Sequence, residues 1–128
     1  MSLKGSIKVA GDKSITHRAI IFSSLSKGTT MIHEPLLGAD CNSTLEIFKQ
    51  FGVKSELSKD CLTITSPGLE CFCSDQSILD AGNSGTTARL LMGVLSNLPA
   101  TLTLIGDEYL SKRHMNQVTL TLTTMGAN

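Results

Sequence analysis

Polar and apolar residues alternate over residues 3–10, LKGSIKVA, and this pattern predicts a β-strand that ends at Gly11. Over residues 14–27 the apolar side chains instead recur at helical spacing, and Gly28 follows as a C-terminal stop. Residues 29–34, TTMIHE, then predict a short strand. The chain therefore opens with a strand, a helix and a second strand.

A second helix and a hairpin follow this opening. Residues 43–52, STLEIFKQFG, predict a helix that ends at its final glycine and that Asp40 or Asn42 caps. Residues 53–58 and 61–66 have the composition of two strands, and the Lys-Asp pair between them fits a hairpin turn.

After an extended stretch over residues 70–80, the sequence repeats itself approximately at an offset of 71 residues. The similarity is weak in residue identity but consistent in order and spacing, as a duplicated folding unit predicts. The matched segments are 12–21 with 83–92, 29–34 with 100–105 and, after three inserted residues, 45–53 with 119–127.

The repeat decides how the last segment is interpreted. Residues 115–126, MNQVTLTLTTMG, are rich in Val and Thr and would by themselves predict a strand. Their counterpart in the first unit is a helix, so we predict a helix that ends at Gly126. The first unit continues into its hairpin after this point, whereas the second reaches Asn128, and we interpret the second unit as interrupted.

Composition indicates one globular domain in 128 residues, with 41% hydrophobic residues and a mean hydropathy of +0.12. Because the formal net charge is zero, we expect no broad attraction to nucleic acid or to membranes. No apolar run approaches the length of a membrane span. The N-terminus lacks the apolar core of a signal peptide, so we predict a cytoplasmic location.

The cysteines and histidines do not suggest a metal site. The closest cysteine pair has CxC spacing, and the histidines are scattered along the chain, so reduced and buried thiols are the better interpretation. The residues concerned are Cys41, Cys61, Cys71, Cys73, His17, His33 and His114.

Arginine occurs only at positions 18, 89 and 113, each in an unusual stretch. Its planar fork of donors suits carboxylates and phosphates, although three solvated surface arginines remain the alternative. The first stretch places Lys13 and Ser14 at a helix start, with Arg18 on the same face as Ser14. Cations are unfavourable at the positive end of a helix dipole, so we infer that an anion binds there.

The second stretch, DAGNSGTTARLL, presents Asn83, Gly85 and Thr86 just before a helix, and Gly85 allows close approach of a ligand to the backbone. It matches neither GxxxxGK[ST] nor GxGxxG. Arg89 lies one turn further, within reach of a ligand or of Asp80.

The third stretch, GDEYLSKRHMNQV, carries Lys112 and Arg113 in a predicted loop before the last helix. The acidic residues Asp107 and Glu108 precede them, so a local ion-pair cluster is the alternative to ligand binding.

Together these stretches resemble the 5-enolpyruvylshikimate-3-phosphate synthase family, whose other name is 3-phosphoshikimate 1-carboxyvinyltransferase. The resemblance runs from about Lys4 to the end through GDKSITHRAIIFSSLSKG, LLGADCNSTLEIFKQFGV, DAGNSGTTARLLMGVL and GDEYLSKR. It implies an α/β prism built from repeated βαβαββ units, of which this chain is the N-terminal third or less. Residues 1–11 would then be a strand of the first globular domain, and residues 12–128 part of the second.

The resemblance implies transfer of the enolpyruvyl group of phosphoenolpyruvate to the 5-hydroxyl of shikimate 3-phosphate, without metal or organic cofactor, by a monomeric enzyme. Lys13 is similar to a lysine that touches both substrates. Ser14 and Arg18 correspond to contacts of shikimate 3-phosphate. The expected contacts of phosphoenolpyruvate are Gly85 and Arg113, with Asn83 and Thr86 lining the same pocket.

The chain departs from the family pattern at His114, where proline is usual, and at Asn42, where a bulkier residue is common. The family's acid–base carboxylate would lie beyond this chain, so we expect the chain alone to be inactive. Two alternatives stay open: a UDP-N-acetylglucosamine enolpyruvyl transferase, which would carry a Lys-Asn pair at Lys13-Ser14, and a non-enzymatic module that binds phosphorylated metabolites.

Overall fold

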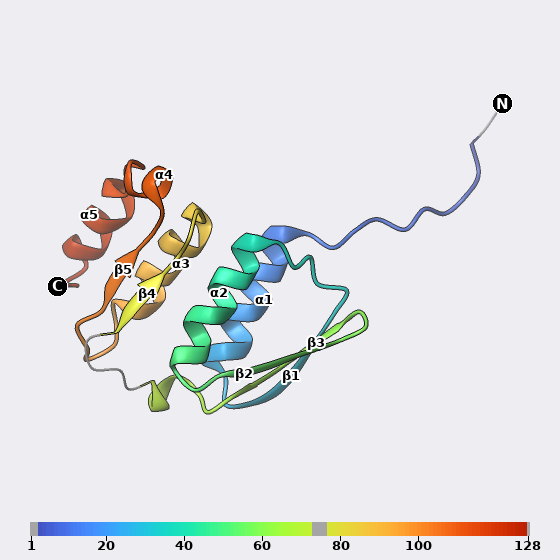
Figure 1. The fold of residues 1–128 in the computed structure, drawn as a ribbon, viewed down its shortest axis with the longest axis horizontal. Helices are drawn as coiled ribbons and strands as arrows, with labels where there is room; N and C mark the ends of the chain where they lie inside the picture. Colours follow the sequence, from blue (N-terminus) through green and yellow to red (C-terminus); the bar gives the residue numbers. More distant parts are fainter. Residues whose placement is uncertain (1–2, 73–76, 128) are drawn as a thin grey trace.

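The computed structural model describes residues 3–72 and 77–127, which form two groups of helices and strands lying side by side (Figure 1). The first group consists of α1 (Lys13–Leu25), β1 (Gly28–His33), α2 (Ala39–Gln50), β2 (Lys54–Ser58) and β3 (Cys61–Ser66). The second consists of β4 (Ile78–Asp80), α3 (Gly85–Leu95), β5 (Thr103–Ile105), α4 (Glu108–Ser111) and α5 (Asn116–Thr124). A short 3-10 turn, η1 (Leu69–Cys71), follows the first group.

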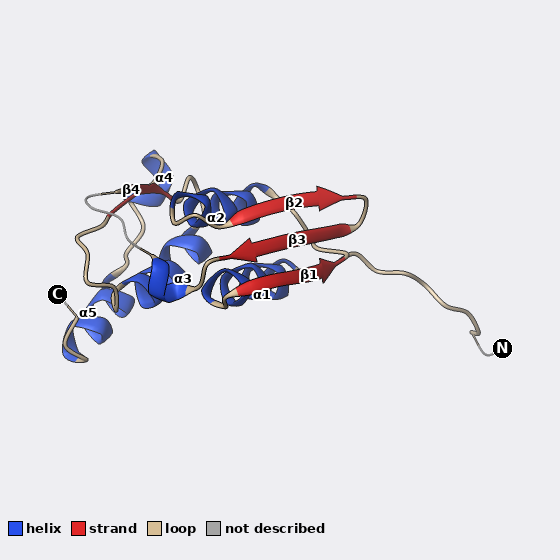
Figure 2. Cartoon of the chain, turned by 90° about the horizontal axis from the view of Figure 1, so that it is seen from below, coloured by secondary structure: helices blue, strands red, loops and turns tan. Residues whose placement is uncertain are grey.

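The first group is a three-stranded antiparallel sheet with β3 in the centre, and α1 and α2 cover one of its faces (Figure 2). Side chains alternate across a strand, so Leu62 and Ile64 of β3 point into the core, whereas Thr65 is exposed. Ile20 of α1 and Phe48 of α2 are completely buried in the same cluster. Burial of each such side chain contributes about 1.5–3 kcal/mol relative to exposure.

In the second group, β4 and β5 form a two-stranded parallel sheet, and α3 packs against both α2 and α5. Leu79 of β4 and Leu91 of α3 belong to the same buried cluster as the first group. Figure 1 shows that α1, α2 and α3 all begin at the same end of the molecule. Their unpaired N–H groups, and the positive ends of their dipoles, therefore gather at that end.

The predicted repeat is confirmed in the order of its elements, because α1–β1–α2 recurs as α3–β5–α5 with α4 inserted before the last helix. Glycines with positive φ follow both second helices, Gly52 at 85° and Gly126 at 97°. The predicted hairpin is also confirmed as β2 and β3.

The last segment is helical, as the repeat predicts and against its β-propensity. Thr121 and Thr124 donate their hydroxyl hydrogens to carbonyls one turn earlier in α5, at 2.7 and 2.8 Å. The helix thus satisfies these polar side chains internally, which removes part of the preference of threonine for strands.

The strand expected at residues 3–10 does not form, and this segment projects from α1 as an extended arm (Figure 1). Strand geometry requires hydrogen bonds to a neighbouring strand, and no described residue supplies them. Leu3, Ile7 and Val9 are consequently exposed. The assignment of this segment to another globular domain stays a prediction.

The predicted cap of the second helix is wrong. Helix α2 begins at Ala39 with Gly38 as its N-cap, because the Gly38 carbonyl already accepts the first helical hydrogen bond, from the Asn42 N–H at 3.1 Å. Asp40 and Asn42 therefore lie inside the first turns. Within the extended stretch predicted over residues 70–80, β4 is extended as expected, residues 70–71 belong to the 3-10 turn η1, and residues 73–76 lie outside the described residues.

Candidate functional site

The first cation lies where α1 and α2 begin. Asp12 caps α1 by accepting the Ile15 N–H at 2.7 Å, and Lys13 is the first residue of the helix. The Lys13 ammonium lies 3.0 Å from the carboxylate of Asp40, whose place in the first turn of α2 suits a negative charge. This pair is partly exposed and contributes at most about 1 kcal/mol, and a lysine has three N–H donors. Lys13 is therefore still available to an anionic ligand.

Ser14 and Arg18 lie on the exposed face of α1, one turn apart, as their spacing predicts. The Arg18 guanidinium donates to the Ser14 carbonyl oxygen at 3.0 Å and forms no ion pair with any described residue. Among the described residues, no hydrogen bond or ion pair connects these two residues to Asn83, Gly85 or Arg113.

Two guanidinium groups lie against Gly85, the first residue of α3. A Cβ atom at this position would be 2.9 Å from Nη1 of Arg89 and 3.0 Å from Nη1 of Arg113. Any larger residue would therefore push these groups away. Arg89 makes only long contacts with the carbonyls of Gly85 and His114, both at 3.5 Å. Sequence reasoning left Arg89 undecided, although it falls on Arg18 in the repeat.

Arg113 is positioned through Asn83. The guanidinium donates to the Asn83 side-chain oxygen at 3.0 Å, and the Asn83 amide donates to the Asp107 carboxylate. Asp107 also caps α4 by accepting the Leu110 N–H at 2.7 Å. This N–H and then the Asn83 amide hold the pKa of Asp107 below its usual value.

The alternative of a local ion pair applies to the neighbouring lysine. Lys112, the residue that follows the short helix α4, pairs with Glu108 one turn earlier. Arg113, in contrast, forms no ion pair among the described residues, although its charge contributes to the lowered pKa of Asp107.

Every ion pair in the described ranges involves a lysine, at positions 8, 13, 49 and 112. The arginines thus keep most of their donors free, and Arg89 and Arg113 place like charges together. An anion would relieve this repulsion and match the planar donors of both groups. The arrangement is suited to a phosphate or a carboxylate. Thr86 is half-buried beside Gly85.

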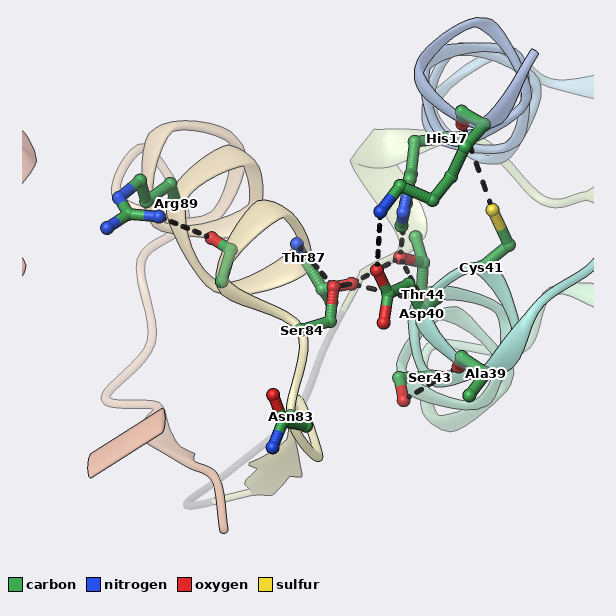
Figure 3. Close-up of polar contacts among 12 residues, drawn as sticks. His17, Ala39, Asp40, Cys41, Ser43, Thr44, Asn83, Ser84, Thr87 and Arg89 are labelled. Carbon is green, nitrogen blue, oxygen red and sulfur yellow. Dashed lines mark hydrogen bonds and ion pairs between the residues drawn. The ribbon is translucent and has the colours of Figure 1, made fainter. Parts of the chain in front are cut away.

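A buried chain of polar side chains connects the starts of α1, α2 and α3 (Figure 3). The His17 imidazole Nδ1 lies 3.0 Å from the Thr44 hydroxyl, which lies 2.9 Å from the Thr87 hydroxyl. Thr87 donates to the Asp40 carbonyl oxygen at 3.1 Å and lies 2.7 Å from the hydroxyl of Ser84, the N-cap of α3. Burial lowers the pKa of His17, so its imidazole is neutral at pH 7. Residues so far apart in the sequence give no local signal, and sequence reasoning missed this chain.

Two cavities lie beside the predicted site, and Arg113 is the one predicted site residue that borders either of them. One of about 650 Å³ lies among β4, β5, α3 and α5 and is lined mainly by apolar residues. Another of about 410 Å³ borders Arg113 and includes Met92, Leu110 and Met115 in its lining. Lys13, Ser14, Arg18, Asn83, Gly85 and Thr86 line neither cavity. An anion at these residues would lie on an open surface of this chain.

No group of three metal-ligating residues occurs in residues 3–72 and 77–127. Cys41 is buried, as expected, and burial raises the pKa of its thiol. Cys71 is exposed, against the expectation of buried thiols, because η1 lies at the surface, and Cys73 lies outside the described residues. Among the described helices, none is long and apolar enough to cross a membrane.

Known proteins similar in sequence and known proteins similar in structure belong to the same family. A family model described as EPSP synthase (3-phosphoshikimate 1-carboxyvinyltransferase) matches residues 1–128. Proteins named 3-phosphoshikimate 1-carboxyvinyltransferase from Staphylococcus epidermidis and Bacillus velezensis are 49% and 46% identical over 126 residues. These matches cover 98% of this chain and 29% of each relative, so the chain spans less than a third of their length.

A solved EPSP synthase from Acinetobacter baumannii has the same arrangement of elements. It superposes with a TM-score of 0.90 at 40% sequence identity, covering 97% of this chain and 28% of the solved one.

Proposed function

Because this chain belongs to the EPSP synthase family, we propose that it is the N-terminal part of a carboxyvinyltransferase. The reaction would transfer the enolpyruvyl group of phosphoenolpyruvate to the 5-hydroxyl of shikimate 3-phosphate and release phosphate. A cytoplasmic location and a monomeric state, which the sequence predicts, fit this proposal and stay predictions.

The observation that carries the proposal is the pair of guanidinium groups at Gly85, without carboxylate partners, at the end of the molecule where three helices begin. Phosphoenolpyruvate carries both a phosphate and a carboxylate, and its reaction requires these groups to be held in place while charge shifts. We assign Arg113, Gly85, Asn83 and Thr86 to this substrate, and we add Arg89.

Shikimate 3-phosphate would bind at α1. Ser14 and Arg18 face solvent together and supply a hydroxyl and a guanidinium for its phosphate. Lys13 lies between this face and Asp40 of α2, and Asp40 is connected through its backbone carbonyl to Thr87 of α3. Because these contacts join the starts of α1, α2 and α3, they support a position of Lys13 between the two proposed substrate sites.

The activity is tested by joining residues 1–128 to the remaining part of the Staphylococcus epidermidis relative and assaying carboxyvinyl transfer. We expect turnover by the joined protein and none by the 128-residue chain alone. Turnover by the chain alone would contradict the incomplete site, and an inactive but folded joined protein would contradict the function.

The same joined protein separates the other two functions. Turnover with UDP-N-acetylglucosamine in place of shikimate 3-phosphate would favour the sister transferase. That enzyme would be expected to have asparagine where this chain has Ser14. Binding of phosphorylated metabolites without any transfer would favour a non-enzymatic module.

A further inference from the structure

His17, Thr44, Thr87 and Ser84 form one connected polar chain at the junction of three helices that otherwise pack through apolar side chains (Figure 3). His17, Thr44 and Thr87 are completely buried. Apolar residues of similar size often fill such a junction with equal or greater stability, so a buried polar chain suggests a role in fixing one arrangement.

Counting donors assigns the tautomer of His17. Its Nε2 has no hydrogen-bond partner within the part of the chain that the structure describes. If Nε2 carried the proton, this buried N–H would have no acceptor. The Thr44 hydroxyl would then have to donate its hydrogen to Nδ1. If Nδ1 carries the proton, it donates to Thr44, and the Thr44 hydroxyl is free to donate to Thr87 or to the Asp40 carbonyl. The second arrangement leaves only an unpaired lone pair, which costs less.

The two ends of this buried polar network contact the residues of the proposed site. Asp40 accepts from Thr87 through its backbone and holds Lys13 through its carboxylate. Ser84, at the other end, directly precedes Gly85, on which Arg89 and Arg113 rest. A rotation of α3 relative to α1 would therefore break this chain and change the distance from Lys13 to the two guanidinium groups.

We propose that His17 is a positioning residue: by donating from Nδ1 to Thr44, it holds the start of α3 in register with the start of α1, so that Lys13 and the Arg89–Arg113 pair face one pair of ligands. The inference rests on the proposed function for the identity of those ligands. The geometry of the chain itself does not depend on it.

The test compares His17→Leu with His17→Asn in the protein that joins residues 1–128 to the remaining part of the Staphylococcus epidermidis relative. An asparagine Nδ2 lies close to the place of the imidazole Nδ1 and preserves the donor, whereas leucine removes it. For His17→Leu we expect phosphoenolpyruvate to bind about twofold to tenfold more weakly, the factor of one lost buried hydrogen bond, when shikimate 3-phosphate is present. Binding of shikimate 3-phosphate alone should be unchanged, because Ser14 and Arg18 do not belong to the buried polar network.

His17→Asn should restore the wild-type affinity, and the exposed His33→Asn serves as the matched control. Thr44→Val should behave like His17→Leu, with Ser43→Ala, its neighbour on α2, as its control. Equal affinities for phosphoenolpyruvate in wild type and His17→Leu would overturn the positioning role while leaving the proposed function intact. If the wild-type joined protein bound neither ligand, the proposed function would fail instead.

A second measurement needs neither ligand nor variant. The imidazole ¹⁵N spectrum of the wild-type chain should show His17 as the neutral tautomer with its proton on Nδ1. A proton on Nε2 would overturn the inference even if His17→Leu did not fold.

Discussion

At the scale of single residues, Gly85 leaves room for two guanidinium groups, and filling that room should affect binding more than folding. A Cβ at Gly85 would meet only the mobile ends of Arg89 and Arg113. For Gly85→Ala we therefore expect a melting temperature within a few degrees of the wild type, but about tenfold weaker binding of phosphoenolpyruvate, the loss of one charge-assisted hydrogen bond.

Gly93→Ala in the same helix is the matched control for this change. No atom lies within 4 Å of its Cβ position, so alanine should only stabilise α3, by up to about 1 kcal/mol. Calorimetry and ligand titration of both variants provide the check. Unchanged binding by Gly85→Ala would show that the two guanidinium groups do not hold the ligand.

His17 makes the stability depend on pH. Burial lowers its pKa from the ordinary 6.5, and Lys13 and Arg18 act in the same direction against the carboxylate of Asp40. The imidazole of His17 is therefore protonated more readily in the unfolded chain than in the folded one. The contribution of neutral His17 to the free energy of unfolding is complete above pH 6.5 and declines as the pH falls below it. Urea unfolding between pH 7.5 and 5 should show this decline in the wild type and a smaller one in His17→Asn. Parallel pH profiles would contradict a buried, neutral His17.

The chemistry of the residues was more accessible from the sequence than their partners. Arginine at positions 18, 89 and 113 pointed to anion binding because it is rare in this chain and lies near a predicted helix start or in the loop before one. The pairing of Lys13 with Asp40 and of His17 with Thr44 spans 27 residues in each case. Such contacts depend on how α1 packs on α2, which local patterns do not contain.

At the scale of elements, the start of α3 depends on its cap. The Ser84 hydroxyl accepts the Thr87 N–H at 3.1 Å and also contacts the Thr87 side chain. Ser84→Ala should therefore reduce the free energy of unfolding by about 1–2 kcal/mol. Ser96→Ala, at the exposed end of the same helix, should change it by less than about 0.5 kcal/mol. Equal effects of the two substitutions in urea denaturation would contradict the capping role of Ser84.

Most helices and strands followed from periodicity, and the exceptions have a physical cause. Residues 115–126 were predicted as helix only through the repeat, since their Val and Thr content favours a strand. Residues 3–10 have a strand pattern without a strand, because the pattern specifies which face is apolar but does not provide a hydrogen-bonding partner. Gly38 replaced Asp40 and Asn42 as a cap through its backbone alone.

At the scale of the whole molecule, the two groups of elements share one core. Leu79 of β4 is completely buried in the same cluster as Phe48 and Ile64 of the first group. Leu79→Ala should thus reduce the free energy of unfolding by about 2–5 kcal/mol, whereas the exposed Leu120→Ala should have little effect.

A shared core also predicts a single unfolding transition. Tyr109, the one tyrosine in a chain without tryptophan, lies on α4 and reports on the second group by fluorescence. The midpoint of urea unfolding followed by Tyr109 fluorescence should coincide with the midpoint followed by far-UV circular dichroism. Two separate midpoints would show that the groups fold independently.

The architecture and the family were thus predictable from ordered motifs, whereas the sharing of a core between the groups was not. Arginines from separate segments are expected to bind the two anionic substrates. Because the chain has three arginines, their side-chain Nε–H signals are few enough to follow individually by NMR. Shikimate 3-phosphate should shift the signal of Arg18, and phosphoenolpyruvate should then shift those of Arg89 and Arg113 more than sulfate does at equal ionic strength. If both substrates leave all three signals where sulfate leaves them, these arginines do not bind the substrates.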